Sequence, residues 1–173
     1  MAKTNDQNIE SCCSKDQHTL DVEGMARRMA LMYHFFTRTL KEELGRDDTE
    51  RLLKRAIWRY GEYIGRQTKE RAEEMGMEPS LENFAAASDL PTKGWDSETK
   101  TDTPEESRVV VQYCPFAEVW KDMGDPELSK LYCLVDPAKY KAYDARLHCE
   151  HVHNQLEGDD YCEIYVRKQK ELG

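Results

Sequence analysis

The sequence lacks a long run of apolar residues near its start. Residues 1–18, MAKTNDQNIESCCSKDQH, are polar, which excludes a secretory signal or a membrane span in this stretch. We therefore expect a cytoplasmic protein whose cysteines remain thiols in a reducing compartment. Reduced cysteines favour catalytic or metal-binding roles over a disulfide framework, although Cys12 and Cys13 lie in a polar stretch that is typical of a disordered tail.

An excess of positive charge is also missing. The chain has 25 Lys and Arg residues against 34 Asp and Glu residues, which gives a net charge of -9. Nucleic-acid binding requires clustered Lys and Arg, and here the basic residues are interleaved with acidic ones along the predicted helices. We therefore expect a small-molecule partner, with no nucleic acid and no membrane. Self-association into an oligomer stays open.

The spacings that identify metal sites are missing as well. The sequence contains no CxxC and no HExxH, so we expect no metal and no other cofactor. Cys149, His151 and His153 alternate along one predicted strand, and thiolate and imidazole suit zinc. A zinc site on these three with another cysteine is one alternative. Proton transfer by His151 or His153 is another, since histidine titrates near neutral pH.

Helical periodicity dominates the first half of the chain. From about residue 21 to residue 44, apolar residues in steps of three and four form one helical face: Met25, Met29, Met32, Phe36, Leu40 and Leu44. We interpret its methionines as core residues. A second helix ends at Gly76 and carries on one side Leu53, Ile57, Tyr60, Ile64, Thr68, Ala72 and Met75. Gly61 and Gly65, one turn apart in it, favour close helix packing, with a nearby ligand as the alternative.

These patterns divide the chain into parts. Residues 1–20 are expected to be a disordered tail, and residues 21–168 a single domain. Its helical part, 21–88, ends with a short third helix. Residues 89–106 are polar and turn-rich, which predicts a spacer or a mobile flap. Trp95 would either pin this segment to the surface or close it over a pocket.

The remaining part, residues 107–168, mixes strands and helices. It begins with a β-branched strand, 108–113, and closes with a hairpin of residues 147–156 and 160–168. Cys162 shares a face of the last strand with Ile164 and Val166, which should be the core face. We predict an α+β fold in which an N-terminal helical pair packs with a small C-terminal antiparallel sheet and intervening helices.

Cys114 is the first candidate for catalysis. It would be the N-cap of a helix beginning at Pro115, where free backbone N–H groups and the helix dipole lower a thiol pKa. A buried, inert cysteine is the alternative. Cys133 and Asp136 share a helical face. Because a carboxylate raises the pKa of a neighbouring thiol, Asp136 would act as general acid or base or bind a substrate ammonium group. Alternatively, it caps the helix restarting at Pro137.

Three motifs in order resemble the L-2-amino-thiazoline-4-carboxylic acid hydrolase family. They are CPF followed by Trp120 in the 114–120 helix, C-x2-D at 133–136, and G-D-x2-C-E-I at 158–164. With the helical first half, the resemblance covers roughly residues 22–168. It implies hydrolysis of a C–N or C–S bond in a small cyclic amidine, which opens a thiazoline ring to an N-carbamoyl-cysteine.

The motif residues that carry over are Cys114, Cys133, Asp136, Gly158, Asp159 and Cys162. We predict a cysteine-dependent hydrolase with Cys114, Cys133 and Asp136 as catalytic residues. On the helix-terminus argument Cys114 is the first choice of nucleophile and Cys133 the second. Predicted substrate-binding residues are Cys162, His151, His153, Asp159 and Trp120. The run HCEHVHNQLEG departs from the threonine-containing run expected before the glycine, which leaves the substrate open.

A non-catalytic alternative accounts for the same pattern. The closing hairpin is also similar to the small-molecule-binding domain associated with 4-vinyl reductases, a related α+β architecture. In this alternative the protein is a sensor or carrier, and the thiols merely line a pocket. One cysteine that reacts with an alkylating agent far faster than the others favours catalysis, whereas uniformly slow thiols favour a carrier.

Overall fold

The computed structural model describes residues 15–91 and 93–169, so Cys12, Cys13 and most of the predicted tail lie outside the described residues. The elements, in chain order, are α1 (Gln17–Leu44), α2 (Arg46–Glu74), α3 (Leu81–Ala87), β1 (Asp96–Asp102), β2 (Glu106–Tyr113), α4 (Pro115–Asp122), α5 (Pro126–Ser129), η1 (Lys130–Leu134), α6 (Val135–Tyr143), β3 (Leu147–His153), η2 (Gln155–Glu157) and β4 (Cys162–Lys168).

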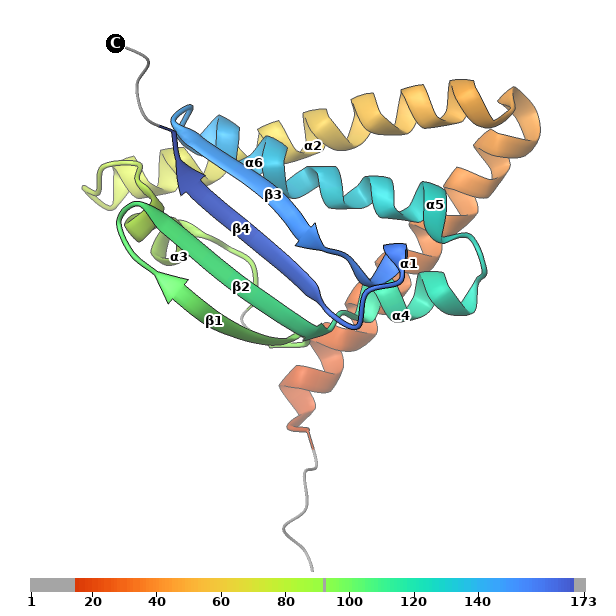
Figure 1. Ribbon diagram of the computed structural model, residues 1–173, viewed down its shortest axis with the longest axis horizontal. Helices are drawn as coiled ribbons and strands as arrows, with labels where there is room; N and C mark the ends of the chain where they lie inside the picture. Colours follow the sequence, from red (N-terminus) through yellow and green to blue (C-terminus); the bar gives the residue numbers. More distant parts are fainter. Residues whose placement is uncertain (1–14, 92, 170–173) are drawn as a thin grey trace, which may run out of the picture.

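The four strands form one antiparallel sheet in the order β1-β2-β4-β3. In Figure 1 the sheet stands in front of the helices, and α6 and α2 run behind its β3 side. The helical pair α1 and α2 precedes the sheet in sequence. The α+β prediction is therefore confirmed, including the predicted hairpin of β3 and β4.

Helix α1 differs from the prediction in where it begins and in which face it buries. It begins at Gln17, because the side chain of Asp16 caps it by accepting a hydrogen bond from the Thr19 amide at 2.9 Å. Its buried residues are Ala26, Ala30, His34 and Thr37. The predicted apolar face is instead largely exposed, with Met25 at 61% and Phe36 at 65%. The interpretation of its methionines as core residues is therefore wrong.

Helix α2 buries part of the face that its periodicity predicts: Leu53, Ile57, Thr68 and Ala72 are buried, whereas Tyr60 and Met75 are 39% and 59% exposed. Its buried residues are Thr49, Leu53, Ile57, Gly61, Gly65, Thr68 and Ala72. The two glycines lie against α6: a Cβ on Gly61 would stand 2.6 Å from the Val135 carbonyl oxygen, and one on Gly65 would overlap the Lys139 carbonyl. The prediction that they mark close helix packing is confirmed, and this packing places α6 against α2.

Residues 89–106, expected as a spacer or flap, contain strand β1 and the β1–β2 turn. The sequence looked like a loop because β1 is an edge strand with almost every residue exposed, so its side chains are polar. Its backbone pairs with β2. Trp95, just before β1, packs edge-on against Phe116 with ring centroids 5.8 Å apart.

Candidate functional site

The centre of the candidate site is a buried polar group between α6 and β3. Asp136, in the first turn of α6, accepts a hydrogen bond from Lys139 Nζ at 2.8 Å and one from His151 Nε2 at 3.1 Å. Their side chains are only 14–17% exposed. The helix-capping alternative for Asp136 is excluded, since Leu134 is the N-cap and Asp136 makes no capping bond.

Asp136 and Lys139 stabilise each other's charged form. Burial would raise the pKa of the Asp136 carboxyl, but the charge of Lys139 and the hydrogen bonds from His151 and Lys139 outweigh it and hold that pKa well below its ordinary value. Burial conversely lowers the pKa of the Lys139 ammonium, but the charge of Asp136, together with its hydrogen bond, raises this pKa by more, so it lies above the ordinary value. Asp136 and Lys139 are therefore ionised across the neutral range.

A cavity of about 300 Å³ opens beside this group, and we call it the site cavity. The residues that line it are Lys130, Leu131, Cys133, Leu134, Pro137, Glu150, His151, Asn154 and Glu157. Of the predicted site residues, Cys133 and His151 line it. Asp136 reaches it through its hydrogen bond to His151. The cavity therefore brings together a thiol and an imidazole that is held by a carboxylate.

Asn154 and Asp159 organise the end of β3. The Asn154 side chain points its Nδ2 at Cys133 Sγ, 3.7 Å away, and its backbone N–H donates to Asp159 Oδ2 at 2.7 Å. His153 Nδ1 lies 3.5 Å from the same carboxylate, and its ring packs on Tyr161. Neither His153 nor Asp159, both predicted to bind substrate, lines the site cavity. They hold the turn that positions Asn154.

The thiols of the site are protonated. Burial, followed by the nearby charge of Asp136, raises the pKa of the Cys133 thiol far above its ordinary value. Cys114 is the N-cap of α4 as predicted, but burial raises the pKa of its thiol, although the amides of Ala117 and Phe116 lower it. The expectation that the helix terminus keeps Cys114 anionic is therefore wrong, because its sulfur is desolvated among the residues around Trp120.

Two other predicted substrate-binding residues belong to the core. Trp120 is 2% exposed and donates from Nε1 to the Ala30 carbonyl at 2.9 Å, which ties α4 to α1. Cys162 is buried on the core face of β4, and its sulfur accepts a hydrogen bond from the Gln155 amide at 3.4 Å. Neither lines the site cavity, because both side chains are enclosed by neighbouring residues.

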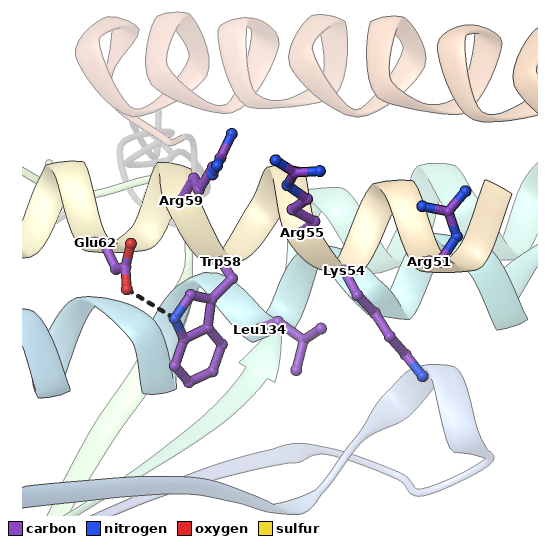
Figure 2. A pocket seen from close by; sticks show the side chains of 7 residues that line it. All are labelled: Arg51, Lys54, Arg55, Trp58, Arg59, Glu62 and Leu134. Atoms are coloured by element: carbon purple, nitrogen blue, oxygen red, sulfur yellow. Dashed lines mark hydrogen bonds between the residues drawn. The ribbon is translucent and has the colours of Figure 1, made fainter. Parts of the chain in front are cut away.

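A second cavity, of about 670 Å³, lies along α2, and we call it the basic groove. It is lined by Arg51, Lys54, Arg55, Trp58, Arg59, Glu62 and Leu134. Leu134 borders both cavities, so the two are neighbours. Figure 2 shows Lys54 and Trp58 on the side of α2 that faces Leu134, the arginines projecting from the other side in this view, and Trp58 bonded to Glu62.

Sequence reasoning missed Lys139 and Asn154. Lys139 follows Asp136 by three residues, so it shares a helical face with a carboxylate already singled out, and this spacing was a usable signal. Asn154 carried no such signal, because its role depends on the turn that Asp159 closes.

Within residues 15–91 and 93–169, no group of three or more His, Cys, Asp or Glu side chains is placed to hold a metal ion. Cys149 is 4% exposed and packs in the core with Leu147 and Val166, and a register irregularity separates His151 from His153. The predicted alternation of these three residues on one face is therefore interrupted. In the same described ranges, no helix has the length and apolar character needed to cross a membrane.

Comparison with known proteins gives a family and a fold. The family model described as L-2-amino-thiazoline-4-carboxylic acid hydrolase matches residues 25–166. No curated protein matches the chain. Among solved structures, a trafficking protein particle complex subunit 3 from Naegleria fowleri, covalently bound to palmitic acid, superposes with a TM-score of 0.53 at 17% identity, covering 84% of this chain and 95% of that one.

A further solved structure is the phenol-responsive sensory domain of the transcription activator PoxR with phenol. Its TM-score is 0.49 at 13% identity, with 91% of this chain and 79% of that chain covered.

Proposed function

Because the chain belongs to the L-2-amino-thiazoline-4-carboxylic acid hydrolase family, we propose that it hydrolyses a small cyclic amidine of the thiazoline type to a carbamoyl product. The observation that carries this proposal is the position of Cys133 and His151 on the wall of one cavity, with His151 bonded to Asp136. A thiol and an imidazole that a carboxylate orients, both facing one cavity, are the groups used for nucleophilic catalysis.

Cys133, the second choice from sequence, is the nucleophile in this proposal, since Cys114 does not line the site cavity. Its thiol is neutral, so the proton must leave as the sulfur attacks. His151 Nδ1 is buried and has no hydrogen-bond partner among the described residues. It accepts that proton while Cys133 Sγ bonds to the amidine carbon. The adduct then releases the ring sulfur, which takes the proton from His151 and leaves as a thiol.

Water completes the reaction by adding to the same carbon. Cys133 departs as a thiol, and the carbamoyl product is released, so one water is consumed for each ring opened. Asp136 is a positioning residue in this scheme: its low pKa keeps it ionised, so it orients His151 and favours the imidazolium that forms during attack. The proton donor is then His151, and Asp136 is assigned neither acid catalysis nor binding of a substrate ammonium group.

The acidic group of the substrate needs a cation. Lys130 lines the site cavity together with Cys133, and its ammonium now pairs with Glu157 at 2.6 Å. Because Lys130 is 38% exposed, it can exchange this partner for a substrate carboxylate. The scheme draws on side chains alone and uses neither metal nor cofactor. We place the reaction in a reducing compartment, the cytoplasm, because Cys114, Cys133, Cys149 and Cys162 are free.

The test is an assay of ring opening of L-2-amino-thiazoline-4-carboxylic acid, in which the released thiol is measured. Cys133→Ser and His151→Asn should each lower kcat by about 100-fold or more, while Cys114→Ser stays within about twofold. Full activity of Cys133→Ser would falsify the covalent scheme. Failure of the wild-type protein to open this ring and related cyclic amidines would remove the hydrolase assignment.

One observation favours a second candidate, a non-catalytic sensor or carrier of small molecules. The pKa of each of the four described thiols lies above its ordinary value, mainly through burial. Thiols that only line a cavity need no activation. A carrier should retain its ligand unchanged through purification, and all its thiols should react slowly with iodoacetamide. A hydrolase should turn over substrate, and Cys133 should be protected by a bound substrate analogue.

A further inference from the structure

Helix α1 exposes a continuous apolar surface on the side opposite its buried residues. Six large side chains within residues 25–36 are 37–65% exposed: Met25, Met29, Leu31, Met32, Phe35 and Phe36. Single exposed apolar residues are normal, but a contiguous group of this size on a protein surface marks an interaction site. Twelve residues of helix extend about 18 Å, so the patch is long and narrow. It belongs to none of the cavities described above.

The spacing of this patch fits another helix. Met25, Met29, Met32 and Phe36 follow one another in steps of four, three and four, the 3.5-residue period of a seam between paired helices. Side chains of this size and exposure present on the order of 600 Å² of apolar surface, close to the ~800 Å² that each partner of a standard interface buries. A helix of similar length is therefore a suitable occupant.

The charges beside the seam indicate that this helix is a second α1. Arg28, Phe35 and Glu42 are spaced seven apart, so they lie on the same flank of the helix. When two α1 helices pair antiparallel about a two-fold axis at Phe35, Arg28 of each copy faces Glu42 of the other. Arg28 is exposed and forms no ion pair within the described part of the chain, and Glu42 pairs only with Arg38, with both side chains 61% exposed.

We propose that α1 is the interface of a symmetric, antiparallel dimer of this chain. Phe35 lies at the two-fold axis, Met32 packs on Phe36 of the second copy, and two Arg28–Glu42 pairs flank the seam. A two-fold interface is self-complementary, and this register makes both the apolar and the charged residues of α1 complementary to themselves. The proposal does not rest on the hydrolase activity.

Sedimentation of the full chain over a range of concentrations tests the dimer. The wild-type protein should dimerise, and Met32→Lys should raise the dissociation constant at least about tenfold. Arg28→Glu and Glu42→Arg should each weaken the dimer several-fold, and the double variant should restore it. Arg59→Glu, an equal charge change on α2, is the control, and thermal unfolding shows whether each variant is folded. A monomer at every concentration, or a double variant as weak as the single ones, overturns the proposal.

Cross-linking distinguishes the orientation. Phe35→Cys places two thiols at the axis, so mild oxidation should give a covalent dimer faster than in the wild-type protein, which carries the same native cysteines. Thr39→Cys, one turn further along the exposed side, should not cross-link, because its copies lie about 12 Å apart along antiparallel helices. Equal cross-linking at both positions indicates parallel pairing and overturns the model of the interface, as does binding of the patch to lipid vesicles by a monomer.

Discussion

The two long helices use their residues in opposite ways. Helix α1 presents methionine and phenylalanine to solvent and packs inward through Ala26, Ala30 and Thr37. Helix α2 turns Leu53 and Ile57 inward and uses glycine where α6 comes closest. A hydrophobic face therefore predicts that a surface will be covered, but it does not identify the element that covers it.

The difference has consequences for the site. The α2–α6 contact is so close that it fixes the distance of α6 from α2, and α6 carries Asp136 and Lys139. Helix α1 lies against α4 and holds Trp120, away from the site cavity. Changes on α6 and α2 should therefore affect both stability and chemistry, whereas changes on the outer side of α1 should leave the fold and the site intact.

The largest effect is expected from the buried pair on α6. Asp136→Asn leaves the Lys139 ammonium buried without its counter-charge and should lower the free energy of unfolding by about 3 kcal/mol. Urea denaturation measures this change. The matched control is Asp125→Asn, which breaks the more exposed pair with Lys41 on α1 and should cost less than about 1 kcal/mol. Equal losses would show that the two regions do not differ.

The same pair should shape the dependence of stability on pH. The pKa of Asp136 is lower in the folded protein than in the unfolded chain, so its contribution is present above about pH 4 and is lost as the pH falls through the folded-state pKa. The pKa of Lys139 is raised, so its contribution is present below about pH 10 and is lost above it. The free energy of unfolding, measured between pH 7 and pH 2, should therefore decrease more steeply on acidification in the wild-type protein than in Asp136→Asn. Parallel curves would contradict this account.

Much of the fold could be predicted from the sequence because its signals are local. Periodicity placed α2, and β-branched residues with the Gly158 turn placed β2, β3 and β4. Strand β1 was missed because an edge strand with exposed side chains keeps polar residues. The residues of β1 also give no local signal for its pairing with β2. The exposed face of α1 was misassigned because burial is decided by the neighbouring element and not by the helix.

The site could be predicted only in part. Motif positions named Cys133 and Asp136, and strand alternation singled out His151, which the structure places against Asp136. For Cys114 the sequence left open an activated thiol and a buried, inert one, and it could not decide between them, because the burial that raises the pKa of this thiol comes from distant parts of the chain. Trp120 and Cys162 were taken for binding residues because a motif does not distinguish residues that hold a site from residues that touch a ligand.

The next effect is expected at the glycines of α2. Gly65→Ala would place a Cβ in the Lys139 carbonyl and 2.8 Å from Ala142 Cβ, which forces α6 away from α2. We expect a loss of about 2 kcal/mol in the free energy of unfolding. Displacement of Lys139 should also lower activity at saturating substrate. A variant with wild-type stability and activity would show that α6 has room to adjust and that the close contact does not position the site.

A smaller effect is expected at the mouth of the site cavity. Lys130→Met removes the cation proposed to bind the substrate carboxylate and should raise KM about tenfold with little change in kcat, since the charge is needed for binding and not for chemistry. Lys54→Met is the control, because Lys54 lines the neighbouring basic groove and not the site cavity. An equal rise in KM for both variants would indicate a general loss of positive charge as the cause.

The smallest effect sharpens the comparison between the two helices. Gly24 lies inside α1, and a Cβ at this position would meet nothing within 4 Å. Gly24→Ala should therefore raise the free energy of unfolding by about 0.5–1 kcal/mol, because alanine loses less backbone entropy in a helix. Replacement of glycine by alanine should thus stabilise α1 at Gly24 and destabilise α2 at Gly65, since only Gly65 is in contact with another backbone. Urea denaturation of Gly24→Ala beside Gly65→Ala measures the difference, and two changes of the same sign would mean that propensity outweighs packing in both helices.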